Sequence, residues 1–134
     1  MISKNSRLEK VAGILVFLMI LLQGTYGIFA YLDPIAFSNV RGTELYTAMD
    51  ADWIVIYGSR TLFITFILGY LLYVRNYLIL MWCALFGLVM PVTDGILAYE
   101  AEAQFKVVVK HVATVLYLLV TYFVLKKVYR LESL

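Results

Sequence analysis

Three ionisable side chains stand inside long apolar stretches of this sequence. Arg60, Asp94 and His111 each belong to a different apolar run. A charge inside membrane hydrocarbon is costly unless it faces protein or water, so such residues are functional-site candidates by default. The planar fork of an arginine suits a carboxylate, and we therefore expect an ion pair between Arg60 and Asp94 with His111 hydrogen-bonded nearby. The pair either fixes the register of the helices or lines a water-accessible pocket in which Asp94 is a base or His111 titrates.

The composition places these residues in a membrane protein. The chain has 134 residues, of which 63% are hydrophobic and 15% charged, and its mean hydropathy is +0.88. Crossing a membrane takes about 20 apolar residues, and four segments approach this length, at about 11–31, 53–73, 77–99 and 107–125. We predict a single transmembrane domain over residues 1–134, an all-α, integral membrane four-helix bundle. The net charge of +2 is too small to suggest a nucleic-acid partner.

The distribution of basic residues predicts the orientation of the chain. Seven Lys and Arg flank the membrane on the side of the two termini and Arg75, whereas three lie in the opposite loops. Because cytoplasmic flanks carry the excess of Lys and Arg, both termini are expected in the cytoplasm, N-in and C-in.

Prolines mark the irregular places in the chain. Asp33 and Pro34 end the first helix, since proline disfavours helical geometry in the residue before it. The connection over residues 33–52 is expected to be a surface loop or a short interfacial helix, which either caps the bundle or forms a lid. Pro91 is expected to kink the third helix at the carbonyl of Gly87, which must then find another donor.

The polar residues of the predicted helices lie at similar depth. At 1.5 Å per residue, Asp94, Arg60 and His111 fall roughly 6 to 11 Å below the outer boundary, in the layer that Gln23 reaches. The candidate residues for this polar cluster or a ligand site are Gln23, Tyr26, Tyr57, Arg60, Asp94 and His111. A separate stripe of small residues, which lets another helix approach closely, consists of Thr61, Thr65 and Gly69.

No catalytic motif accompanies the cluster. The sequence has one histidine and one cysteine, Cys83, so we predict no metal site and no intrachain disulfide. A nucleophile elbow, a phosphate-binding glycine loop and a dinucleotide fingerprint are all absent from the sequence. The catalytic residues, if the protein is an enzyme, stay unassigned, and no cofactor is certain.

The arrangement resembles the small four-helix membrane proteins of the DoxX-like superfamily, in particular its uncharacterised branches. The matching features are Gly58-Ser59-Arg60, the segment from Pro91 to Asp94, and His111, within about residues 53–127. The family pattern has an acidic residue after the arginine, where this chain has Thr61. The resemblance implies a four-helix bundle in the bacterial inner membrane, with some relatives linked to quinone-coupled sulfur oxidation or oxidative-stress complexes.

Three functions follow from these features. The first is an accessory or structural subunit that packs against a larger membrane protein through the stripe of Thr61, Thr65 and Gly69. The alternative is a protein that binds a quinone or a lipid in a cavity beside Asp94, with redox or isomerase chemistry using Asp94 and His111. Transport ranks third, since polar groups in one half of the bundle offer no continuous path unless the chain forms a homo-oligomer. In each case membrane lipids are partners.

Overall fold

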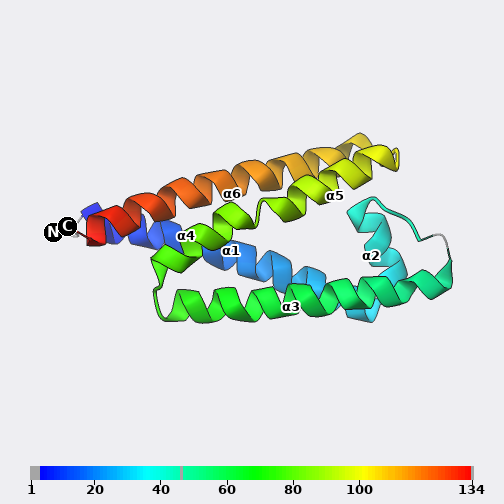
Figure 1. The fold of residues 1–134 in the computed structure, drawn as a ribbon, viewed down its shortest axis with the longest axis horizontal. Coiled ribbons are helices and arrows are strands. Elements are labelled where there is room, and N and C mark those ends of the chain that lie inside the picture. Colours follow the sequence, from blue (N-terminus) through cyan, green and yellow to red (C-terminus); the bar gives the residue numbers. More distant parts are fainter. Residues whose placement is uncertain (1–3, 46, 134) are drawn as a thin grey trace.

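The computed structural model describes residues 4–45 and 47–133, and over these residues the chain is helical without strands (Figure 1). The predicted all-α architecture is therefore confirmed. The elements in order are α1 (Lys4–Leu32), α2 (Pro34–Arg41), the 3-10 helix η1 (Ala48–Asp50), α3 (Ala51–Tyr73), α4 (Tyr77–Phe86), α5 (Val89–Glu100) and α6 (Phe105–Glu132).

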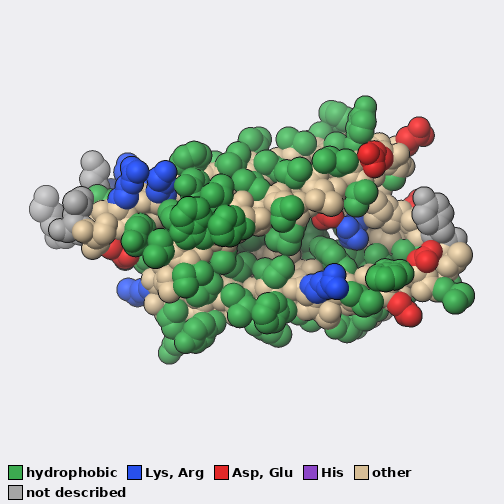
Figure 2. All heavy atoms as spheres, in the orientation of Figure 1, with side chains coloured by type: hydrophobic (Ala, Val, Ile, Leu, Met, Phe, Trp, Pro, Cys, Tyr) green, Lys and Arg blue, Asp and Glu red, His purple; other side chains and the backbone are tan. Residues whose placement is uncertain are grey.

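Four helical segments are long and apolar enough to cross a membrane. They are Ser6–Leu32, Ala48–Tyr73, Tyr77–Glu100 and Phe105–Glu132. On the face shown in Figure 2, apolar side chains cover the flanks, and most of the visible acidic side chains lie toward the end opposite the termini. The chain is thus a multi-pass membrane protein whose outward apolar side chains face lipid.

The helices extend beyond the expected apolar spans. α1 begins at Lys4 and α6 continues to Glu132, whereas the hydropathy pattern predicts about 11–31 and 107–125 for these helices. The reason is that hydropathy marks the part of a helix that lies in hydrocarbon, whereas polar residues continue the same helix into water.

The third predicted span is broken where the proline predicts it. α4 ends at Phe86 and α5 begins at Val89, one turn before Pro91, which cannot donate to the carbonyl of Gly87. The backbone N–H of Met90 donates to that carbonyl at 3.1 Å. The kink is confirmed, and the freed carbonyl has the replacement donor that a membrane interior requires.

The bundle has two ends of different character (Figure 1). Both termini lie at one end, here called the terminal end, and α2 lies at the other, the α2 end. α1 packs mainly on α3, and α4 and α5 pack on α6. A closed apolar core joins the helices toward the terminal end, formed by Ala12, Val16, Leu71, Tyr77, Leu80, Met81, Ala84, Leu125 and Val128.

Candidate functional site

The site is organised by α2, a helix of eight residues with both ends satisfied locally. The Asp33 carboxylate accepts a hydrogen bond from the N–H of Ala36 at 3.0 Å, and Pro34 occupies the first turn. Gly42 ends the helix with φ +85, and its N–H donates to the carbonyls of Ser38 and Asn39. Cap, proline and glycine are the signals that define a short helix. The predicted short helix between the first two spans is therefore present.

Phe37 fixes α2 to the pair of α1 and α3. Its side chain is fully buried. Its ring lies 5.6 Å from that of Tyr26, 5.5 Å from that of Phe29 and 5.6 Å from that of Tyr57, measured between centroids. Aromatic pairs at this separation attract beyond the area that they bury, so α2 is docked rather than loosely laid over the bundle.

Asp94 is paired with Arg41 of α2. The guanidinium Nη2 donates to Asp94 Oδ1 at 2.7 Å, and the two side chains are 18% and 19% exposed. The expected pair of Arg60 with Asp94 is therefore wrong. Arg60 is exposed on the face of α3 that points away from the bundle, whereas Gly58 and Thr61 are buried. Depth along a helix gives the height of a side chain but not the direction in which it points.

Two residues at the start of α6 hold the C-terminus of α2. Lys110 Nζ donates to the carbonyl of Val40 at 2.6 Å, and His111 Nε2 lies 3.2 Å from the carbonyl of Arg41. The last carbonyls of a helix have no partner within it, and basic side chains there also suit the helix dipole. His111 is 7% exposed. α2 thus links α1 and α3 on one side to α5 and α6 on the other.

The two cations also contact aromatic rings. Arg41 Cζ lies 4.6 Å from the ring centroid of Tyr57, and Lys110 Nζ lies 5.8 Å from that of Tyr26. Such contacts favour a cation that has lost part of its water. The buried Nε of Arg41 has no hydrogen-bond partner among the described residues, so this guanidinium keeps donor capacity beyond the bond to Asp94.

These groups surround a small polar pocket of about 40 Å³. Of the six residues predicted for the cluster, the pocket brings together Gln23, Tyr26, Tyr57, Asp94 and His111, and it leaves out Arg60. Sequence reasoning missed Arg41 and Lys110, which also line it. One feature of the sequence points to Arg41 as a site residue. It is the single Lys or Arg within residues 33–52, and it directly precedes the glycine that ends α2.

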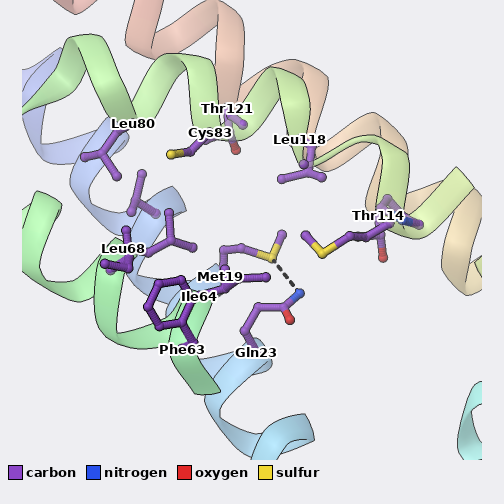
Figure 3. Close-up of a pocket in the computed structure, with 16 residues that line it drawn as sticks. Met19, Gln23, Phe63, Ile64, Leu68, Leu80, Cys83, Thr114, Leu118 and Thr121 are labelled. Carbon is purple, nitrogen blue, oxygen red and sulfur yellow. Dashed lines mark hydrogen bonds between the residues drawn. The ribbon is translucent and has the colours of Figure 1, made fainter. Parts of the chain in front are cut away.

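An apolar cavity of about 250 Å³ adjoins the polar pocket, toward the middle of the bundle (Figure 3). Four residues line both spaces: Gln23, Met90, Pro91 and Thr114. The cavity runs from Gln23 and Thr114 toward Leu68 and Leu80 (Figure 3) and also touches Cys83. The two spaces are therefore neighbours, with polar groups at the α2 end and apolar side chains beyond.

Most hydrogen-bond donors along the apolar cavity already have partners. Thr114 and Thr121 donate their hydroxyls to the carbonyls of Lys110 and Tyr117 in their own helix. Gln23 Nε2 donates to the sulfur of Met19 at 3.9 Å. The lining therefore presents mainly methyl and methylene groups, which suit a hydrocarbon chain.

A wider polar opening lies on the other side of Lys110, at the α2 end. It has a volume of about 930 Å³ and shares Val40 and Lys110 with the polar pocket. Its other lining residues include Glu44, Glu102 and Lys106. The polar pocket is thus placed between this opening and the apolar cavity.

The predicted stripe of small residues is used partly within the chain. Thr61 is buried, and a Cβ placed on Gly24 of α1 would lie 3.4 Å from Thr65 Cγ2. At Gly69 an added Cβ would meet nothing within 4 Å. The Thr61 and Thr65 part of the stripe therefore receives α1 of the same chain, and only the region of Gly69 is open.

No metal site is apparent in the described part of the chain, where no group of three His, Cys, Asp or Glu side chains is arranged to hold an ion. The site offers instead a cationic and aromatic pocket above an apolar cavity. Such an arrangement can hold an amphipathic molecule with its head and its chain in different surroundings.

Comparison with known proteins gives a family without an assigned activity. One family model matches residues 12–125, and its description is a domain of unknown function (DUF4267). Neither a curated protein nor a solved structure matches the chain.

Proposed function

The chain belongs to the DUF4267 family, and from that starting point we propose that it binds a membrane-soluble molecule with a polar head and a long apolar chain, a lipid or an isoprenoid. The head lies in the polar pocket beside Asp94, and the chain lies in the apolar cavity.

The position of the two spaces next to each other carries this proposal. Ligand sites are mostly apolar clefts with a few converging polar groups, and here Gln23, Met90, Pro91 and Thr114 line both the polar and the apolar part. The volume of about 250 Å³ lies just below the range of about 300 to 1,000 Å³ common for small-molecule sites. It suits part of one chain better than a two-chain phospholipid.

The first function that the sequence predicts is an accessory subunit. It would dock through Thr61, Thr65 and Gly69, and it has less support. α1 covers the region of Thr65 in the same chain, so a larger partner would need another surface. Quinone binding, with redox or isomerase chemistry at Asp94 and His111, is one form of the proposed function and stays a prediction.

In this proposal the chain lies in the bacterial inner membrane with both termini in the cytoplasm and the α2 end at the outer face. The excess of Lys and Arg at the terminal flanks supports this orientation. The DoxX-like resemblance, also a prediction, supports the choice of membrane.

The test is gentle purification from the source membrane followed by mass spectrometry of everything that stays bound. We expect a chain-bearing lipid or isoprenoid in stoichiometric amount. Cys83→Trp fills the cavity and should lose this molecule, whereas Cys83→Ala, the matched control, should keep it. Equal amounts in both variants, or a stoichiometric protein partner with no such molecule, would contradict the proposal.

A further inference from the structure

The two cations of the polar pocket use only part of their hydrogen-bond donors. Arg41 offers five N–H donors and Lys110 offers three, yet the structure gives Arg41 one partner for these donors, Asp94, and Lys110 one, the carbonyl of Val40. Arg41 Nε is buried with no partner among the described residues. The tyrosine hydroxyls of Tyr26 and Tyr57 can donate as well. A head that accepts hydrogen bonds from charged groups has these free donors as partners.

The pocket also carries unbalanced charge. Its charged lining residues are Arg41, Lys110 and Asp94, which sum to +1 with His111 neutral. Two tyrosine rings lie against the cations. Arg41 and Asp94 are mostly buried, whereas Lys110 also lines the wider opening together with Glu44, Glu102 and Lys106. One negative charge on a ligand would neutralise the net charge of the pocket lining.

The pocket itself has room for a small head. A volume of about 40 Å³ holds a few waters, since one water needs about 10 to 15 Å³ by the same kind of measure. A quinone ring with its substituents or a phosphodiester with its headgroup is larger and would have to extend past Lys110 into the wider opening. A carboxylate, with three heavy atoms, fits inside the pocket and carries the charge that Arg41 binds.

We infer that the ligand is a single-chain, long-chain carboxylate, whose carboxylate binds Arg41 and Lys110 and whose hydrocarbon chain passes Gln23 and Pro91 into the apolar cavity. This inference rests on the proposed function and names its ligand class. In the occupied site Asp94 and the ligand carboxylate share the guanidinium of Arg41, which can hold two carboxylates through different edges.

The experiment compares two competitors that differ in the head alone. Purified protein in detergent is photolabelled with a diazirine analogue of hexadecanoate, and labelling is competed by hexadecanoate or by hexadecan-1-ol. We expect the acid to compete at a concentration about 10-fold or more below that of the alcohol, because hydrogen bonds to a charged group are roughly twice as strong as neutral ones. The crosslink should lie on residues of the apolar cavity.

Variants then assign the preference to its residues. Arg41→Gln should weaken acid binding by about 10- to 100-fold more than it weakens alcohol binding. Arg60→Gln, the same substitution at an exposed position of α3, should change neither. Asp94→Asn breaks the same ion pair but frees Arg41, so it should strengthen acid binding. If Arg41 and Asp94 only held α2 in place, both variants would weaken acid and alcohol alike.

The outcomes separate this inference from the function on which it rests. Equal competition by acid and alcohol, with labelling still in the cavity, would overturn the carboxylate and leave chain binding intact. Labelling that neither competitor reduces would overturn both. A preference for the acid that survives in Arg41→Gln and falls in Arg60→Gln would place the head elsewhere and also overturn the inference.

Discussion

The terminal end and the α2 end of the bundle hold the same helices together in different ways. Toward the terminal end, apolar side chains from α1, α3, α4 and α6 close on one another, and Tyr117 of α6 adds a bond of 2.7 Å from its hydroxyl to the carbonyl of Leu15. Toward the α2 end, α2 bridges the helices through an ion pair, two bonds to its own carbonyls and one aromatic cluster. Close packing of side chains fills the space between helices, whereas helices connected by hydrogen bonds and an ion pair can leave a cavity between them.

The difference explains where a site can exist. The apolar cavity borders the packed core, and Val16, Leu80 and Ala84 belong to both. A membrane gives helices no hydrophobic drive to associate, so packing and polar contacts hold them. The apolar cavity therefore lies between the closely packed core and the helices that α2 connects through polar contacts.

The largest effect on stability should come from breaking the ion pair between Arg41 and Asp94. Arg41→Gln or Asp94→Asn leaves one charge without its partner, and we expect each to lower the free energy of unfolding by about 2 to 4 kcal/mol. This is somewhat below the about 3 to 5 kcal/mol of a fully buried pair, because both side chains retain nearly a fifth of their exposure. The free energy of unfolding is measured by titrating SDS into lipid-free protein held in a mild detergent.

A double-mutant cycle supplies the control for this pair. Arg41→Gln and Asp94→Asn together should cost clearly less than the sum of the single changes. Arg60→Gln combined with Asp94→Asn should be additive within about 0.5 kcal/mol, as for sites without contact. Coupling of Arg60 to Asp94 instead would restore the pairing that the sequence alone suggests and contradict the observed one.

The packed end should respond less strongly. Leu125 is fully buried in the core, and Leu125→Ala should cost about 1 to 3 kcal/mol. Soluble cores lose about 2 to 5 kcal/mol in such changes, but part of that is transfer to water, which is small when the unfolded helix stays in lipid. Leu116→Ala, at a position 58% exposed in the same helix, is the control and should be nearly neutral in the same unfolding assay.

The glycine that ends α2 should give an effect of similar size at the other end of the bundle. Gly42 has φ +85, and an added Cβ would lie 2.7 Å from Val107 Cγ1. Gly42→Ala should therefore cost about 1 to 3 kcal/mol, the range for a strained backbone position. It should also weaken acid binding, because Arg41 directly precedes this glycine. A variant with unchanged stability and unchanged binding would show that the end of α2 does not position Arg41.

The sequence predicts the helices and the depth of the polar layer, but it does not predict the contacts of α2 with α5 and α6. Hydropathy defines the four spans, Pro91 predicts the kink, and the rise per residue places Asp94 and His111 at one level. The path of residues 33–52 is not set by hydropathy, so the sequence does not place Arg41 beside Asp94, and depth alone points to Arg60. The cues of Asp33, Pro34 and Gly42 indicate where α2 begins and ends, but no sequence pattern reports the volume that side chains leave empty.

The smallest effect should be a gain, at Gly69 in α3. An added Cβ there meets nothing within 4 Å in this chain, and alanine is more favourable than glycine inside a helix by about 0.5 to 1 kcal/mol. Gly69→Ala should therefore raise the free energy of unfolding by about that amount in detergent. If the open part of the small-residue stripe receives a partner helix in the native membrane, the same variant should lose that partner during gentle purification although the isolated chain is more stable. A more stable variant with an unchanged set of co-purifying molecules would show that Gly69 faces lipid, which leaves the α2 end as the place where this protein meets its ligand.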